Sequence, residues 1–241
     1  MTNWLKPDWP APSRVKACVT TRDGGFSLPP FEGLNLGSHV GDDPLAVERN
    51  RQVLTSTLAC RPAWLSQVHG VHVVQADPGR VDEADASWTA EPGVASAVLT
   101  ADCLPALFCD RAGSKVAAAH AGWRGLANGV LEATLDALAL PAEEVLVWLG
   151  PAIGPAAFEV GPEVREAFVA SHPEAGQAFR PSVNEGKYMA DIYQLARIRL
   201  AARGIHAVYG GGFCTVSDPR FYSYRRASRT GRFASLVWLA G

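Results

Sequence analysis

The chain has 241 residues, of which 48% are hydrophobic and 19% charged, the composition of a globular protein long enough to bury a sizeable core. A formal net charge of −2 excludes a strongly basic surface, so neither nucleic acid nor an anionic membrane is expected as the main partner. The N-terminus shows no export signal, and no apolar stretch approaches the roughly 20 residues that span a bilayer. These features together predict a cytoplasmic protein.

Short apolar runs alternate with turn signals in the first half of the chain. A strand is expected over 14–21, where Val15, Ala17 and Val19 share one face, and a helix over 45–58. Further strands are expected at 63–68, 71–76, 95–100, 106–109 and 115–120.

The second half of the chain becomes helical after Gly122, and one helix is expected over 126–138, before Pro141. Two more helices are expected at 162–171 and 191–202, and strands at 145–149, 207–209 and 234–239. Strands and helices mix without strict β-α-β alternation. This pattern predicts an α+β fold of mixed β-sheets flanked by helices, in a single domain over 1–241.

The five cysteines are odd in number and widely scattered, which favours reduced thiols over a disulfide framework. No Cys-x-x-Cys pair occurs, so a closed structural zinc ribbon is not expected. Four of the five are interpreted as inert core or near-core thiols: Cys18, Cys60, Cys109 and Cys214.

Three segments place a potential metal ligand at the end of an apolar strand, next to a small residue. The ligands are His69 in segment 67–70, Cys103 in segment 100–105 and His120 in segment 118–125. Zinc binds imidazole nitrogen and thiolate sulfur, and a catalytic zinc keeps three protein ligands and one open position. The residue types suit such a site, although each histidine alone could be structural and Cys103 alone a small buried hydrophobe.

Nine motifs, in order and covering nearly the whole chain, resemble one known family. They are TTRDGG (20–25), NLG (35–37), VGDD (40–43), NR (50–51), QVH (67–69), TADCLP (100–105), HAGWRG (120–125), GPAIGP (150–155) and FYSYRR (221–226). The family has long been labelled multicopper polyphenol oxidase or laccase-like and is now described as purine nucleoside phosphorylase. It also includes a peptidoglycan editing factor. One departure occurs at Tyr222, where the family's motif usually has Phe, and it keeps an aromatic side chain.

The resemblance implies a zinc enzyme whose metal ligands are His69, Cys103 and His120, with copper as a less favoured metal. It implies phosphate-dependent cleavage of adenosine, inosine and methylthioadenosine, together with deamination of adenosine. The partners would be a purine nucleoside and phosphate, and the chain would be a monomer or a homodimer. The usual nucleobase deaminase signature, His-x-Glu, is missing, because Gly70 and Val71 follow His69. Asp102 is the candidate proton carrier in its place.

Two groups of polar residues are candidates for substrate binding. Arg51 could bind phosphate or nucleoside, or be an exposed helix arginine; Asn35 could contact the ligand, or shape its own loop. Asp102 could be an acid or base, could orient a metal ligand, or could be a turn residue. The pair at 225–226 could bind an anion or be solvated, and His39 and His206 have no partner that the sequence identifies.

The segment after His120 is the second group. Gly122, Trp123 and Arg124 stand at an expected helix start, where free N–H groups attract anions. They are therefore predicted to form an anion site beside the metal, the alternative being a packing Trp and a solvated Arg.

The same residues bear on four other functions. A multicopper laccase needs many histidines, often as His-x-His, and none of the six histidines is so arranged. A cysteine hydrolase with Cys103 as nucleophile would leave one of the two histidines unexplained. The editing-factor branch would make the chain an amide hydrolase on a cell-wall precursor, using the same metal. A binding module without catalysis is the remaining alternative.

Overall fold

The computed structural model describes residues 3–241, which form four sheets. The four-stranded sheet has the order β1 (Val15–Val19), β15 (Phe233–Leu239), β7 (Val94–Thr100), β2 (Arg61–Ala63). The six-stranded sheet has the order β14 (Val208–Gly210), β10 (Val145–Leu149), β8 (Leu104–Asp110), β9 (Val116–Ala121), β6 (Ala86–Thr89), β4 (Val73–Gln75). The smaller sheets are β11 (Glu159–Val160), β13 (Tyr188–Ala190), β12 (Phe179–Pro181), and the pair β3 (Leu65–Ser66), β5 (Asp82–Glu83).

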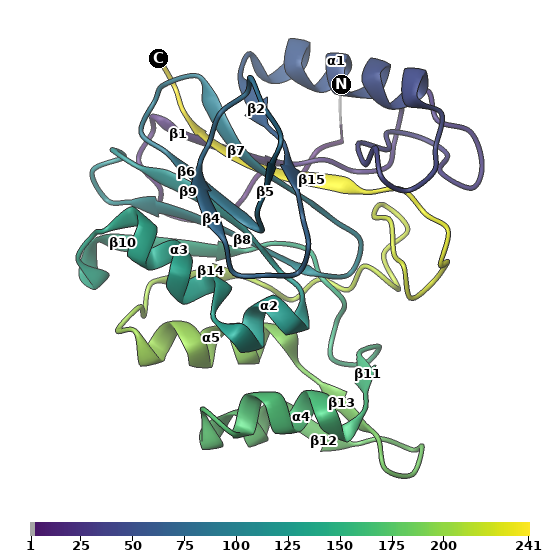
Figure 1. Ribbon diagram of the computed structural model, residues 1–241, viewed down its shortest axis with the longest axis vertical. Helices are drawn as coiled ribbons and strands as arrows, with labels where there is room; N and C mark the ends of the chain where they lie inside the picture. The colour runs from purple at the N-terminus through teal and green to yellow at the C-terminus, as the bar shows by residue number, and fades with distance from the viewer. Residues whose placement is uncertain (1–2) are drawn as a thin grey trace.

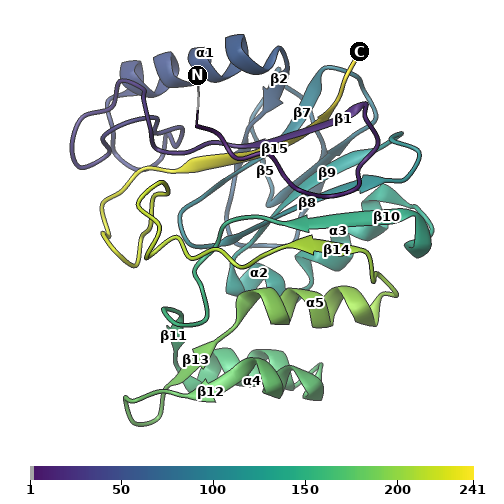
Figure 2. The same ribbon diagram turned by 180° about the vertical axis from the view of Figure 1, so that it is seen from behind.

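Helices cover the outer faces of the two large sheets (Figures 1 and 2). They are α1 (Pro44–Leu58), α2 (Trp123–Asn128), α3 (Val130–Leu138), α4 (Pro162–Val169) and α5 (Ile192–Ala202), with short 3-10 turns at Ala142–Glu144 and Pro173–Ala178. Helix α1 lies over the four-stranded sheet, whereas α2, α3 and α5 lie against the six-stranded one, and α4 with β11–β13 projects beyond α5. Between residues 3 and 241, no helix is both long and apolar enough to cross a membrane.

The two large sheets pack face to face, which buries the inner face of each sheet. Helices cover the outer faces, so both faces of each sheet are buried. One core layer lies between the sheets and includes Val98, Leu107 and Phe233. A second layer joins the six-stranded sheet to α2, α3 and α5, and a third joins the four-stranded sheet to α1. Because neither face meets water, strands such as β7 and β8 are buried throughout and mostly apolar instead of alternating. The predicted class, α+β with mixed sheets flanked by helices, is confirmed.

Two predicted elements are wrong in detail. The helix expected over 126–138 is two helices, because Gly129 has a left-handed φ of 103° and its N–H bonds the carbonyl oxygens of Gly125 and Leu126. The strand expected over 63–68 is interrupted at Trp64 and ends at Ser66. Strands β5, β6 and β11–β13 were not predicted, because they are short or have polar residues between their apolar ones.

Strand register explains why residues distant in sequence meet at one edge. Strands β8 and β9 are antiparallel neighbours in which Pro105 lies opposite His120, so the start of β8 meets the end of β9. Strand β6 pairs with the other side of β9, with Ala86 opposite Ala119. The residues just before β8 and β6 are therefore carried to the end of β9, where His120 stands.

Candidate metal centre

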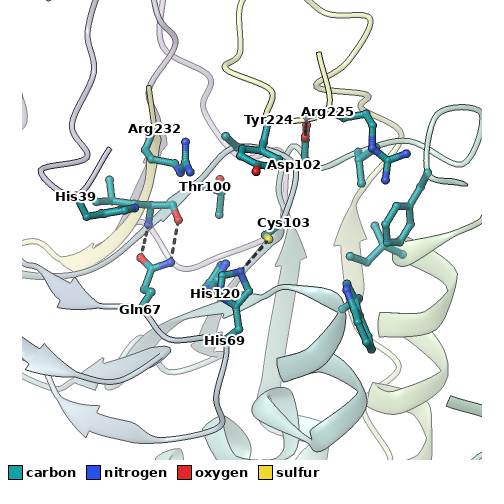
Figure 3. Close-up of a pocket in the computed structure, with 16 residues that line it drawn as sticks. His39, Gln67, His69, Thr100, Asp102, Cys103, His120, Tyr224, Arg225 and Arg232 are labelled. Carbon is teal, nitrogen blue, oxygen red and sulfur yellow. Dashed lines mark hydrogen bonds between the residues drawn. The ribbon is translucent and has the colours of Figure 1, made fainter. Parts of the chain in front are cut away.

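The predicted ligands His69, Cys103 and His120 converge at this edge (Figure 3). One ligand atom from each lies within 4.8 Å of the others, and the Cys103 Sγ lies 3.8 Å from the His69 Nε2. The two imidazole rings are edge to face, with centroids 4.7 Å apart. Two imidazoles and one thiolate that approach a common point could hold a metal ion such as zinc, and this group has no fourth protein ligand.

Asp85 holds two of these ligands in place. Its Oδ1 accepts a hydrogen bond from the His120 Nδ1 at 2.8 Å, so the other ring nitrogen, Nε2, is left for a metal. The same carboxylate accepts the backbone N–H groups of Val68, His69 and Gly70 at 3.2, 2.9 and 2.7 Å. This side chain, fully buried, therefore fixes the tautomer of one ligand and the loop that carries another.

Electrostatics favours the thiolate of Cys103. Burial by itself would raise the pKa of the thiol, but the neighbouring imidazoles of His120 and His69 outweigh it and lower the pKa to about 6. Burial would lower the pKa of His120, whereas the Cys103 thiolate and Asp85 raise it to about 9. Because metals bind the thiolate and not the thiol, the site favours the form of Cys103 that a metal needs.

Gly122 gives the ligands room. A Cβ at this position would lie 2.8 Å from the His69 Cδ2 and 3.1 Å from the Cys103 Sγ. Its φ of −60° is accessible to any residue, so the restriction is the contact and not the backbone. The glycine that follows the strand of His120 is thus needed for the approach of the other two ligands.

A cavity of about 320 Å³, within the size range of ligand pockets, opens at the metal centre. One wall is apolar and is made by Trp123, Ile153, Phe158 and Ile192. The other end is polar, with His39, Thr100 and Arg232, while Tyr224 and Arg225 complete the lining. The cavity therefore offers both apolar surface and cationic groups beside the three candidate ligands.

A family model described as multi-copper polyphenol oxidoreductase laccase matches residues 16–240 of the chain. The chain belongs to this family. A relative from Pseudomonas aeruginosa, named a purine nucleoside phosphorylase, is 72% identical over 99% of both chains. Escherichia coli YfiH, also named a purine nucleoside phosphorylase, is 54% identical over 99% of this chain and 100% of its own.

Solved structures within the same family share the whole architecture. A Neisseria meningitidis protein is 52% identical and superposes with a TM-score of 0.96, covering 99% of this chain and 100% of its own. YlmD from Geobacillus stearothermophilus is 31% identical, with a TM-score of 0.92 over 99% of this chain and 96% of its own. The resemblance seen in the nine motifs is confirmed at the level of the family.

In this member of the family, Arg51 and Asn35 lie outside the cavity wall. The guanidinium of Arg51 donates to the Leu36 carbonyl oxygen at 3.1 and 2.9 Å and lies over the Trp64 ring. Asn35 is fully buried, and its Oδ1 accepts the backbone N–H groups of Gly37 and Arg232. Both side chains shape loops that carry other residues to the site.

Trp123 lines the cavity, but Arg124 is exposed, and its guanidinium lies 4.4 Å from the centroid of the Trp123 ring. Asp102 lines the cavity with a φ of 91°. Its Oδ1 accepts from the Thr215 hydroxyl and its Oδ2 from the backbone N–H of Arg225, each at 2.6 Å. Both oxygens of Asp102 are thus engaged in holding the C-terminal loop beside the metal ligands.

Sequence reasoning gave no role to Asp85, His39, Thr100 or Arg232. Asp85 lies in an acidic stretch, 82–85, that resembles a solvated turn, and the strand that follows it, β6, has too many polar residues to reveal it. Thr100 ends β7 and Arg232 immediately precedes β15, and no local pattern shows that Thr100 pairs with Phe233. The cationic groups that line the cavity are Arg225 and Arg232, in place of the expected Arg51 and Arg124.

Proposed function

We propose that the chain is a zinc-dependent purine nucleoside phosphorylase that acts on adenosine, inosine and methylthioadenosine, with deamination of adenosine as a second activity. The observation that carries this proposal is the His69, Cys103, His120 group opening into a cavity that is lined by apolar side chains and by two arginines. The names of the close relatives agree with the reaction.

Phosphorolysis forms one bond and breaks another at C1′ of the ribose. A phosphate oxygen forms a bond to C1′ of the ribose, the bond from C1′ to N9 breaks, and its electron pair leaves with the purine, which takes up a proton. The reactants must therefore be held in line, with the base on one side of C1′ and the phosphate on the other. The apolar wall of Trp123 and Phe158 suits the base, and the polar end with Arg232 suits the phosphate.

Zinc is proposed on the chemistry of the donor set. A thiolate with two imidazoles also suits copper, but a blue-copper centre commonly has a weak axial Met, and Met189 lies in β13, outside the cavity lining. When bound, zinc supplies a Lewis acid that stabilises negative charge on oxygen or nitrogen and can lower the pKa of water. His69, Cys103 and His120 would hold it, and Asp85 would keep His120 in the binding tautomer.

The test is a mass-spectrometric assay of purified, zinc-loaded protein with inosine or adenosine, with and without phosphate. The proposal expects hypoxanthine or adenine and ribose 1-phosphate only when phosphate is present, and inosine from adenosine in either buffer. The Cys103→Ala variant is the matched negative control. If the zinc protein released no base and formed no inosine, the nucleoside function would be wrong, and hydrolysis of a cell-wall amide would become the leading candidate.

A further inference from the structure

Arg232 presents an unused edge of its guanidinium to the cavity. Its Nη1 donates to the carbonyl oxygens of Thr230 and Gly231, both at 3.0 Å. Its Nε and Nη2 have no hydrogen-bond partner in residues 3–241, and no carboxylate there forms an ion pair with it. These two nitrogens form the fork of parallel N–H donors that matches two oxygens of a phosphate. Arg225, by contrast, uses both terminal nitrogens on the carbonyl oxygens of Ala157 and Glu159.

Thr100 lines the same cavity and carries a second unused donor. Its side chain is 1% exposed, and its Oγ1 has no partner within the described part of the chain. A buried hydroxyl without a partner costs free energy, so native proteins supply one, or leave the group for a ligand. Figure 3 shows Thr100 in the part of the cavity between Arg232 and the Cys103 sulfur.

The fold brings these two residues together. Thr100 at the end of β7 pairs with Phe233 at the start of β15, so Arg232 is the residue next to that pair. The backbone N–H of Arg232 donates to the Asn35 Oδ1 at 2.8 Å. A Cβ on Gly37 would lie 2.8 Å from the Arg232 Cγ, so this glycine lets the loop pack on the arginine stem. The segment Asn35 to Gly37 thus positions Arg232 without touching the cavity.

We propose that the Nε–Nη2 edge of Arg232 and the Thr100 hydroxyl form the subsite for the attacking phosphate. The inference rests on the proposed function and deepens it, because it assigns the phosphate to one end of the cavity and the base to the apolar end. His39 lines the same end, where burial and the nearby Arg232 lower its pKa. Its neutral ring adds a polar neighbour without a second positive charge.

The variants that test the subsite are Arg232→Gln and Thr100→Val, with Thr100→Ser as the conservative change. Arg229→Gln is the matched control, because Arg229 belongs to the same C-terminal segment, is exposed and does not line the cavity. Two measurements are made on each zinc-loaded protein: calorimetric binding of inorganic phosphate without nucleoside, and the KM for phosphate and for inosine during phosphorolysis.

We expect Arg232→Gln to weaken phosphate binding and raise the KM for phosphate by about 10- to 100-fold, the effect of losing a charge-assisted contact. The KM for inosine should change by less than about threefold. Thr100→Val should raise the KM for phosphate by about 5- to 20-fold, while Thr100→Ser stays close to the parent. A merely structural Thr100 would lower the melting temperature on substitution, whereas removing an unpaired buried hydroxyl should leave it unchanged or raise it.

Two results would overturn the subsite. The first is a phosphate affinity and KM that are unchanged in both Arg232→Gln and Thr100→Val. The second is AMP binding more tightly than adenosine in a way that Arg232→Gln abolishes while the KM for phosphate stays constant, because Arg232 would then hold a 5′-phosphate. If the parent protein released no base at any phosphate concentration, the proposed function would fail separately. The calorimetric titration would still report whether Arg232 and Thr100 bind inorganic phosphate.

Discussion

The cavity has a candidate metal end, at His69, Cys103 and His120, and a proposed phosphate end, at Arg232 and Thr100, and the two are built in different ways. Cys103 and His120 stand at the paired ends of β8 and β9, and Asp85 ties His120 to the loop of His69. Arg232, in contrast, leaves a loop just before β15 and depends on Asn35 in a second loop for its position. The metal end should therefore be the more rigid before any ligand arrives, since two of its ligands stand at the ends of paired strands. The following changes test that difference, beginning with the largest expected effect.

Removing two of the three ligands should have the largest effect. Cys103→Ala combined with His120→Ala leaves one imidazole, so zinc affinity should fall by well over ~100-fold, more than for loss of a supporting group. Elemental analysis after dialysis should then find no stoichiometric zinc. Cys214→Ala is the control, because this partly buried thiol lies outside the ligand group, and it should keep one zinc per chain. Zinc retained at one per chain in the double variant would refute the ligand assignment.

Asp85→Asn should weaken the metal end without removing a ligand. The amide cannot accept as the carboxylate does from the His120 ring and three backbone N–H groups, so zinc affinity should fall about 10- to 100-fold. Competition with a chelator measures the change. Asp110→Asn is a matched control, because Asp110 is also buried and accepts backbone N–H groups, from Ser114 and Lys115, but bonds none of the three candidate ligands. Equal zinc affinities in the two variants would remove Asp85 from the support of the centre.

Gly122→Ala should give a smaller loss. The new methyl group would push on the His69 ring and the Cys103 sulfur, so zinc affinity should fall about tenfold, the lower end of what misoriented ligands cost. Gly176→Ala is the control, because a Cβ there meets only ordinary contacts at 3.8 Å or more. The same chelator competition decides the matter, and an affinity equal to that of the control would show that the ligands tolerate the contact.

Asp110 supplies the smallest effect, on stability alone. Burial would raise the pKa of Asp110, but hydrogen bonds from Lys115 and Ser114 outweigh it and lower the pKa. Its contribution, about 1.5–3 kcal/mol for bonds to a charged group, is therefore present above the unfolded pKa of about 3.9. It is lost as the pH falls through the lower folded value.

Urea denaturation of the parent and Asp110→Asn between pH 7 and pH 3 measures this contribution. The difference in unfolding free energy should be constant near neutrality and shrink below about pH 4. A difference that grew on acidification would mean that the carboxylate is not stabilised by these bonds.

Much of the metal end could be predicted from the sequence. Cysteine and histidine are rare enough, with five and six in the chain, that three of them beside small residues at strand ends point to one chemistry. The resemblance to the family's motifs added the expectation that these three residues bind the same metal. The apolar runs located β7, β8, β9, β10 and β15 because strands buried on both faces are apolar throughout.

The phosphate end could not be predicted in the same way. With 22 lysines and arginines in the chain, an arginine near a motif says little about which one reaches the cavity. Arg51 and Arg124 are adjacent to the right motifs in sequence, yet their guanidinium groups pack on Trp64 and Trp123. Arg232 reaches the site only through the register of β7 with β15, a contact between residues 100 and 233 that no local pattern contains.

X-ray absorption at the zinc edge of purified protein loaded with one zinc tests whether His69, Cys103 and His120 hold one zinc with an open position. We expect one sulfur neighbour at about 2.3 Å and two imidazole nitrogens at about 2.0–2.1 Å, with one further light atom. We also expect the sulfur signal to be absent in Cys103→Ala loaded with zinc. A first shell of nitrogen and oxygen alone in the parent protein, or a sulfur neighbour that survives in Cys103→Ala, would contradict this ligand set.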